Sequence, residues 1–248
     1  MQRRALLAAL GGTTALGPLG ANGQTTAQAN PQANPQANTQ ARPPGPPQLK
    51  ALGGERYLVG RIVVDKAAHR FTVPGRVHAL GKPLEYLAAS PGGKKAYEAL
   101  LELDASGTEM NLACILIGLE RDASVPLWKP LGQAGQVGQR VTLSLAWTEN
   151  GQRRQVIAAE ALLDAEARPR ASAVEWAYTG SFTSKDGSQL AADVTGTLIS
   201  FVKKDPTGII EAVSDISLGP YGAVRGSSLL PPEASAVELI VEAVIAPK

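Results

Sequence analysis

The sequence contains one cysteine, two histidines and few aromatic residues, and each scarcity excludes a class of site. One Cys among 248 residues cannot form an intrachain disulfide, a thiolate-rich zinc site or a four-thiolate iron–sulfur cluster. Aromatic residues make up 4% of the chain, whereas sugar-binding clefts usually need several stacking surfaces. The sequence also has no nucleophile elbow, phosphate loop or dinucleotide fingerprint. No cofactor is therefore predicted.

Positive charge is also scarce once the N-terminal segments are set aside. The whole chain has a formal net charge of +2. Arg3, Arg4, Arg42 and Lys50 are the only charged residues before Glu55, so of 24 basic residues the remainder of the chain holds 20, against 22 acidic ones. This balance predicts no basic face for phosphate groups, and we expect no nucleic-acid partner. The hydrophobic fraction of 44% is enough for a globular core.

Residues 1–29 have the layout of an export signal. Arg3-Arg4 precede a short apolar run that glycines and Pro18 interrupt, and this run is too short for a transmembrane helix. The arginine pair resembles a twin-arginine signal, and an ordinary Sec signal is the alternative. Small-residue cleavage sites predict a mature chain that begins between residues 22 and 30. We expect the protein in the periplasm or outside the cell, with no transmembrane segment in the mature chain.

Residues 30–54 are predicted to be a disordered linker. The unit Ala-Asn-Pro-Gln at 29–32 recurs at 33–36 and degenerately at 37–40, and a proline-rich stretch follows. Such a segment has no apolar face to bury, and proline keeps its backbone extended and solvated. The folded body is therefore predicted over residues 55–248.

The folded body is predicted to be an α+β domain dominated by antiparallel or mixed sheets. Two similar β-rich halves are the alternative arrangement. Residues 97–103 fit either a helix or a strand. Strands are expected where apolar residues alternate or β-branched residues gather, at 57–65, 69–73, 83–88, 140–147, 174–182, 195–202 and 236–245.

The Asn-Gly pair at 150–151 predicts a β-hairpin, because both residues tolerate the positive φ of a type I′ turn. The strands are expected near 140–148 and 153–160. Counting outward from a two-residue turn places Leu145 opposite Val156 in the neighbouring strand. The same register places Trp147 opposite Arg154. A second hairpin is expected to turn at Asp186-Gly187.

A short helix is predicted near 108–118. Ser106 and Glu109 have the spacing of a capping box, in which each side chain bonds the backbone N–H of the other residue. Apolar residues fall on both faces of this helix, so it is expected to be largely buried. Cys114 lies on it and is expected to pack in the core as an unreactive thiol.

Glu85 and Glu98 are the acid–base candidates, because two carboxylates in a cleft can cleave glycosidic bonds. Lys94 lies near them in the sequence and could tune one of the two. More often, however, such glutamates lie at an exposed rim or form an ion pair. No catalytic residue is therefore assigned.

Four further residues are candidates for binding. His69 and His78 could bind a metal together with Glu85, but nothing in the sequence fixes them near one another, so no metal site is predicted. Trp176 and Tyr178 alternate along a predicted strand and share one face. That face either packs in the core or forms a ligand platform.

Several short motifs, in this order, resemble the YdjY-like domain family. The resemblance covers about residues 55–245 and is carried by Gly60–Lys66, Leu84–Leu87, Gly93-Lys94 ahead of Tyr97–Leu101, the apolar run Leu112–Gly118, Trp176–Ser181, Ala192-Asp193 and Leu230-Pro231. It implies an exported bacterial domain without an established biochemical activity. The family's glycine–lysine segment often carries a His–Glu pair, and Tyr97 and Glu98 stand in its place. This departure weakens a metal or acid–base role there, and Cys114 alone cannot supply the iron–sulfur segment associated with some members.

Two functions from different classes remain. The first is a non-catalytic cell-envelope module that binds a protein or polymer partner through a sheet surface. The second is a small exported hydrolase that uses Glu85 or Glu98. Because no catalytic motif is present, the sequence favours the binding module. It makes no prediction of the oligomeric state.

Overall fold

The structure is a computed structural model that describes residues 47–130, 138–169, 174–201, 206–213 and 223–245. All of them belong to the unit Pro43–Lys248. The predicted signal segment and most of the predicted linker lie outside the described residues.

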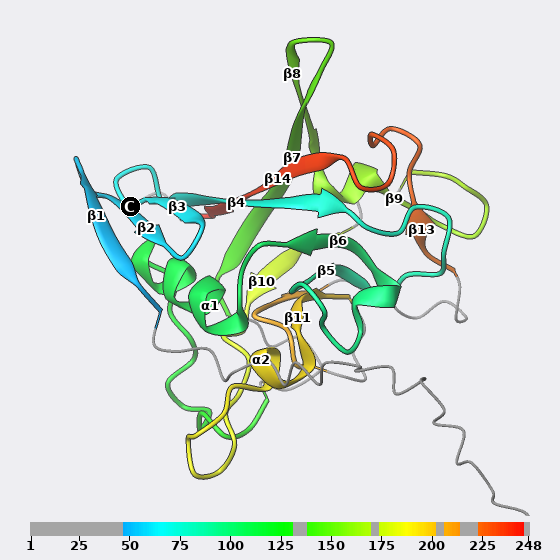
Figure 1. Cartoon of the computed structure of the whole chain (residues 1–248). Coiled ribbons are helices and arrows are strands. Elements are labelled where there is room, and N and C mark those ends of the chain that lie inside the picture. Colours follow the sequence, from blue (N-terminus) through cyan, green and yellow to red (C-terminus); the bar gives the residue numbers. More distant parts are fainter. Residues whose placement is uncertain (1–46, 131–137, 170–173, 202–205, 214–222, 246–248) are drawn as a thin grey trace, which may run out of the picture. The chain divides into compact units, whose positions relative to one another are not determined.

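Strands dominate the described part of the chain, and the helices are short (Figure 1). The helices are η1 Ala96–Glu98, α1 Gly107–Leu116, η2 Ala158–Ala161 and α2 Ala191–Thr195. The strands are β1 Leu49–Gly53, β2 Arg56–Val59, β3 Ile62–Asp65, β4 Arg70–Val77, β5 Tyr86–Ala89, β6 Ala99–Leu103, β7 Arg140–Glu149, β8 Gln152–Ile157, β9 Leu162–Leu163, β10 Trp176–Tyr178, β11 Thr197–Ser200, β12 Ile210–Ala212, β13 Arg225–Gly226 and β14 Ala236–Ala243. The expected β-dominated body is confirmed.

Eight strands form a closed, barrel-like sheet that the sequence did not predict. Their order is β4-β14-β7-β10-β12-β11-β5-β6, and β6 closes the ring by pairing with β4. The sheet is mixed, because β11 runs parallel to β12 and β5 parallel to β6, while the other pairs in the ring are antiparallel. The early strands β5, β6 and β4 lie together in the ring, and the five later strands complete it, so both parts of the chain belong to one closed sheet.

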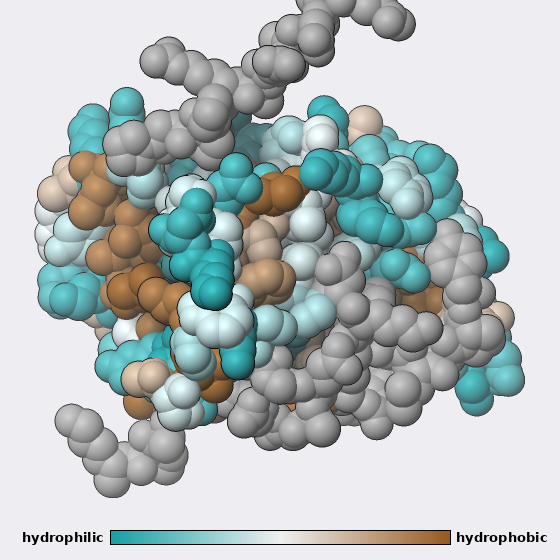
Figure 2. All heavy atoms as spheres, turned by 90° about the horizontal axis from the view of Figure 1, so that it is seen from below, coloured by the Kyte–Doolittle hydropathy of each residue, from teal (hydrophilic) through white to brown (hydrophobic). Residues whose placement is uncertain are grey.

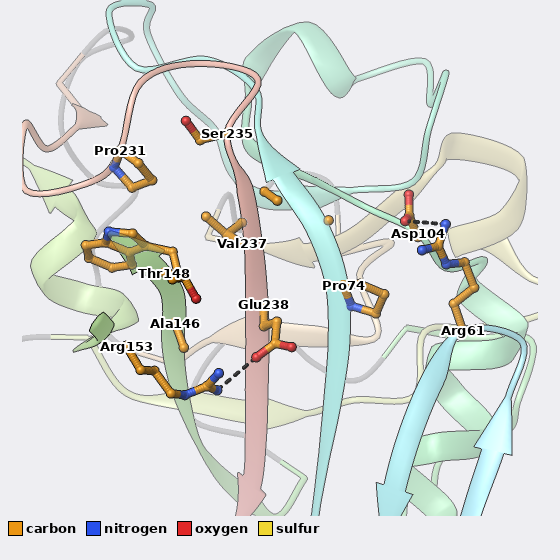
Figure 3. A pocket seen from close by; sticks show the side chains of 13 residues that line it. Arg61, Pro74, Asp104, Ala146, Thr148, Arg153, Pro231, Ser235, Val237 and Glu238 are labelled. Atoms are coloured by element: carbon orange, nitrogen blue, oxygen red, sulfur yellow. Dashed lines mark hydrogen bonds and ion pairs between the residues drawn. The ribbon is translucent and has the colours of Figure 1, made fainter. Parts of the chain in front are cut away.

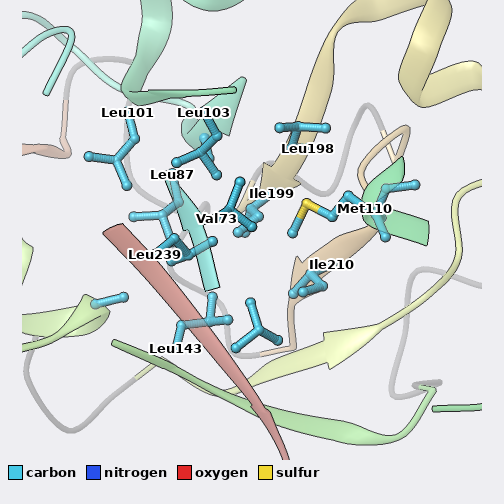
Figure 4. Packing of buried hydrophobic residues seen from close by; sticks show 14 of the residues in the cluster. Val73, Leu87, Leu101, Leu103, Met110, Leu143, Leu198, Ile199, Ile210 and Leu239 are labelled. Atoms are coloured by element: carbon cyan, nitrogen blue, oxygen red, sulfur yellow. The ribbon is translucent and has the colours of Figure 1, made fainter. Parts of the chain in front are cut away.

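The interior of the closed sheet is filled by apolar side chains from every side. Val73, Leu143 and Leu239 come from three adjacent strands, and Met110 of α1 points toward Ile199 of β11 (Figure 4). All five side chains are at most 2% exposed. Burial of this kind is the main source of the fold's stability.

The predicted helix and its capping box are confirmed. The Ser106 hydroxyl accepts a bond from the Glu109 backbone N–H, and the Glu109 carboxylate accepts one from the Ser106 N–H. Cys114 is buried, as predicted, but the next residue, Ile115, is 51% exposed. Four of the ten residues of α1 are buried, so the helix is less buried than expected. Apolar residues therefore reach the surface, as Figure 2 also shows for the lower face of the molecule. No helix in the described part of the chain is long and apolar enough to cross a membrane.

The predicted Asn-Gly hairpin forms in the predicted register. β7 and β8 pair with Leu145 opposite Val156 and Trp147 opposite Arg154. The turn residues at 150–151 have φ values of 50° and 77°, as a type I′ turn requires. The hairpin projects from the closed sheet at the top of Figure 1.

Two predicted strand boundaries near the start of the body are wrong. Residues 57–65 form two strands, because Gly60 has a φ of 58° and turns the chain between β2 and β3. β4 continues through Pro74 to Val77 rather than ending at Pro74-Gly75. β4 pairs with β3 before Pro74 and with β6 after it. Because Pro74 lies between these two pairings, the absence of its N–H removes no backbone hydrogen bond to either strand.

Three other segments differ from the prediction or resolve an ambiguity. The folded part begins with β1 at Leu49, ahead of the boundary expected near Glu55. All side chains of β1 are exposed, so the strand forms through backbone pairing with β2 and carries no apolar pattern that could predict it. The segment 97–103 is mainly strand β6. The turn at Asp186-Gly187 exists, but it joins an isolated bridge between Thr183 and Leu190 instead of two long strands.

Candidate functional site

A groove of about 570 Å³ crosses the closed sheet over β4, β14 and β7 (Figure 3). Its lining comes from these strands and from the segments that flank them, namely Arg61, Pro74, Gly75, Asp104, Ala146, Trp147, Thr148, Arg153, Pro231, Ser235, Ala236, Val237 and Glu238. This volume lies within the range of ordinary ligand sites. We call this feature the sheet groove.

Small side chains form much of the floor of the sheet groove. In the strand register, Glu238 of β14 lies between Pro74 of β4 and Ala146 of β7. Ala236 lies two residues earlier on the same face of β14, because side chains in a strand alternate between faces. A ligand in the groove can therefore approach the backbone of the sheet closely.

Two ion pairs flank the groove on opposite sides, as Figure 3 shows. On one side, Arg153 Nη2 lies 2.8 Å from Glu238 Oε2, and on the other, Arg61 Nη1 lies 3.0 Å from Asp104 Oδ2. The two arginine side chains are 55% and 70% exposed, so their remaining N–H groups can reach a ligand. The groove thus offers two guanidinium groups and two carboxylates, with no net charge.

The acid–base candidates Glu85 and Glu98 are brought together by the fold. The Glu85 backbone N–H donates to the Glu98 carbonyl at 3.0 Å, at the point where β5 and β6 run parallel. Lys95 Nζ lies 3.7 Å from Glu98 Oε2. Burial alone lowers the pKa of Lys95, but Glu98, Tyr97 and Glu85 together outweigh it and raise the pKa above its usual value. This cluster is therefore held as an ion-pair network.

Lys95, not Lys94, is the lysine of this carboxylate cluster. Lys94 has an exposed side chain, and its backbone N–H donates to the Thr195 carbonyl. Lys95 also lies 5.9 Å from the ring centroid of Tyr97. Nothing in the sequence distinguishes these two adjacent lysines, because the short 3-10 helix η1 decides which one faces Glu98.

The two histidines lie just beyond the two ends of β4 and have different partners. His69 Nδ1 is 3.0 Å from the Ile117 carbonyl oxygen, and His78 Nδ1 is 3.7 Å from Glu102 Oε2. Arg76 binds the other oxygen of the Glu102 carboxylate at 2.6 Å. Within the described residues, no group of three or more His, Cys, Asp or Glu side chains is placed to hold a metal ion.

Trp176 and Tyr178 share one face of β10, and that face belongs to the core. Their exposed fractions are 3% and 2%. The Tyr178 hydroxyl donates to Asn111 Oδ1 of α1 at 2.8 Å, and burial raises the pKa of this hydroxyl. Burial also raises the pKa of the Cys114 thiol, which disfavours the reactive thiolate.

Residues from two of the quoted motifs, Trp176–Ser181 and Ala192-Asp193, meet near the contact between α1 and α2, which we call the α1–α2 junction. The Asp193 carboxylate accepts bonds from the backbone N–H and the hydroxyl of Thr108, at the start of α1. The Ser181 hydroxyl accepts a bond from the Ala192 N–H and donates to the Thr207 carbonyl. These motif residues therefore hold the helices and strands in place.

The sheet groove is the feature that sequence reasoning missed. Its charged residues, Arg61, Asp104, Arg153 and Glu238, come from four separate segments. The one available signal was a run of small or polar residues on the outward positions of predicted strands, as at Ala146 and Ala236. That signal is weak, because outward positions of most strands are polar or small.

Comparison with known proteins places the chain in a family. The family model described as the YdjY domain matches residues 62–242. No curated protein and no solved structure matches the chain. The matched range contains α1, α2 and every strand of the closed sheet except the last residue of β14. The chain therefore belongs to the YdjY domain family.

Proposed function

We propose that this protein is an exported binding module of the cell envelope, and that it holds an extended segment of a protein or polymer partner in the sheet groove. The observation that carries the proposal is the groove itself, with small residues on its floor and an ion pair on each side. A ligand lying there meets backbone, hydroxyl groups and charges of both signs.

The charges of the groove favour a polypeptide as the partner. Two guanidinium groups and two carboxylates leave the lining neutral, so a strongly anionic or cationic polymer gains little from it. A polypeptide segment with acidic and basic residues can pair with both sides of the groove. Its amides can also bond Thr148 and Ser235, which line the groove.

Export is part of the proposal and rests on residues 1–29. The arginine pair, the interrupted apolar run and the small-residue cleavage sites support it. N-terminal sequencing of envelope material should give a chain that begins between residues 22 and 30. A cytoplasmic product that retains Met1 would contradict export.

Ligand binding can be tested by filling the groove. The full chain is titrated with peptides of mixed charge and with neutral and anionic glycans. Ala236→Tyr places a ring over the floor at an exposed position and should abolish binding of any ligand found. The matched control, Ala165→Tyr, adds the same ring to an exposed turn away from the groove lining. A ligand that binds both variants as tightly as the parent chain does not occupy the groove.

A small exported hydrolase is the second candidate, because the fold does bring Glu85 and Glu98 together. In that case the parent chain cleaves a peptide or glycan substrate, and Glu98→Gln loses turnover while it remains folded. Lys95→Met should then shift the pH profile of turnover, since Lys95 lies beside the Glu98 carboxylate. Cleavage with these properties would replace the binding-module proposal.

A further inference from the structure

A second, apolar pocket of about 340 Å³ lies where β7 and β10 begin and β14 ends. It shares no lining residue with the sheet groove. Most of its lining is apolar and comes from Val141, Leu143, Ile157, Ala159, Val174, Trp176 and Val244. Two charged residues, Arg140 and Glu175, also line it, and we call it the Arg140 pocket.

The Arg140 pocket has a buried floor and an exposed apolar rim. Leu143 and Trp176 are 2% and 3% exposed, whereas Ile157 and Val244 are 41% and 54% exposed. Two large apolar side chains are thus left in water beside an apolar cavity. An apolar chain that entered the pocket would cover them and would contact the indole of Trp176.

Arg140 gives the pocket a specific polar group. Its Nη2 atom lies 3.5 Å from Glu175 Oε2, and the Glu175 side chain is 66% exposed. Its Nη1 atom is buried and has no hydrogen-bond partner among the described residues. Buried donors in folded proteins nearly always have a partner. A guanidinium is also the side chain best shaped to bind a carboxylate through two parallel bonds.

We propose that the Arg140 pocket binds a small amphipathic carboxylate, such as a fatty acid of medium chain length. The apolar chain packs against Trp176, Leu143 and Ile157, and the carboxylate binds the part-exposed Arg140 guanidinium, which turns its buried Nη1–H toward the ligand. A neutral amphiphile would leave that donor without a partner, and an amphipathic cation could pair only with Glu175, whose carboxylate already pairs with Arg140 Nη2. The proposal is independent of the partner that occupies the sheet groove.

Dodecanoate is a suitable probe, and Trp176 supplies a local reporter. Bromine quenches tryptophan fluorescence on contact, and of the three tryptophans only Trp176 lines this pocket. Titration of the full chain with ω-bromododecanoate, below its micellar concentration, should give saturable quenching that dodecanoate reverses. Dodecylammonium and dodecanol should bind about tenfold or more weakly than dodecanoate in this competition. A loss of this size is expected when a charge-assisted hydrogen bond is removed.

Matched variants locate the ligand's two ends. Arg140→Met keeps the apolar stem and should weaken dodecanoate by about tenfold while leaving dodecanol unchanged. Arg168→Met removes another ion-paired arginine and should leave both ligands unchanged. Val244→Asp, at an exposed rim position, should weaken both ligands, whereas Leu229→Asp, at an equally exposed position elsewhere, should weaken neither.

The outcomes separate the proposal from its alternatives. Absence of quenching by the brominated acid would overturn it. So would equal competition by dodecylammonium and dodecanoate, or equal affinity of the parent chain and Arg140→Met for dodecanoate, because each result would show a general apolar patch. None of these results depends on whether Ala236→Tyr affects a groove ligand, so the two proposals fail separately.

Discussion

The α1–α2 junction and the sheet groove differ in what their residues do and in how visible those residues are in the sequence. At the junction, Asp193 and Ser181 belong to the quoted family motifs, and their side chains bond backbone groups of neighbouring elements. In the groove, Arg153 and Glu238 belong to none of the quoted motifs and are partly exposed. Among the residues that line the groove, only Arg61 and Pro231 belong to quoted motifs, so most of the surface that we propose to bind a partner lies outside them.

This difference predicts opposite consequences of mutation in the two regions. Changes at the junction should lower the free energy of unfolding, because they disturb close packing or leave backbone groups without partners. Changes in the groove should leave stability nearly unchanged and affect only ligand binding. The following predictions test this contrast, from the largest expected effect on stability to the smallest.

Gly107→Ala at the start of α1 should destabilise the protein by about 1–3 kcal/mol, the usual cost of overpacking. A Cβ atom at Gly107 would lie 2.6 Å from the Cβ of Ala192, which is too close for either helix to keep its position. Elsewhere in a helix, Gly→Ala stabilises by up to about 1 kcal/mol, so the sign of the change is informative.

The control for this prediction is the double variant Gly107→Ala with Ala192→Gly, which moves the methyl group to the other helix. It should recover part of the lost stability. Chemical denaturation of the parent chain and of the two variants gives the free energies of unfolding. If Gly107→Ala alone proved more stable than the parent chain, the close approach at the junction would be contradicted.

Asp193→Ala should lower the free energy of unfolding by about 1–2 kcal/mol, the range of a lost helix cap. The carboxylate bonds both the N–H and the hydroxyl of Thr108, and alanine leaves both donors without this partner. Asp193→Asn retains one oxygen acceptor and should cost less. Thermal unfolding of the two variants measures the difference, and equal midpoints for Asp193→Ala and the parent chain would argue against the cap.

Gly151→Val should destabilise by about 1 kcal/mol or more, because a β-branched residue resists the φ of 77° found there. A Cβ at this position meets no other atom, so the effect comes from the backbone alone. Gly151→Asn is the matched control and should cost less, since asparagine tolerates positive φ. An unchanged denaturation midpoint for Gly151→Val would contradict the type I′ turn.

Arg153→Gln should change the free energy of unfolding by less than about 1 kcal/mol, the usual limit for an exposed ion pair. The side chains of Arg153 and Glu238 are 55% and 43% exposed, so water solvates both charges when the pair is broken. The same variant should nevertheless weaken a groove ligand, whereas Arg168→Gln should not. A large loss of stability would show that this pair belongs to the scaffold.

Local features of the fold were predictable from the sequence, and long-range features were not. The turn at 150–151 fixes the register of β7 and β8 through backbone angles alone, and Ser106 with Glu109 fixes the start of α1. Closure of the sheet depends on pairing between β4 and β6 and on strands of three or four residues, such as β10 and β11. Strands this short carry too little alternation to identify their partners.

The candidate sites follow the same division. Glu85 and Glu98 were identified as carboxylates, but their proximity depends on the parallel pairing of β5 with β6. The sequence shows that Trp176 and Tyr178 share one face of a strand, but it leaves open whether that face is core or a ligand platform. The closed sheet decides this, because it buries β10. The sheet groove draws its charges from four segments that come together only in the folded chain, so local patterns indicate it only weakly.

The most direct test of the central claim is to map where a partner binds. Backbone amide chemical shifts of the full chain are recorded by nuclear magnetic resonance before and after addition of the tightest ligand from the peptide and glycan panel. We predict that the shifts change along β4, β14 and the end of β7, together with Arg61 and Asp104, while α1 and α2 keep their shifts. Changes confined to the Glu85–Glu98 cluster or to the α1–α2 junction would contradict the claim that the junction belongs to the scaffold and the sheet groove binds the partner.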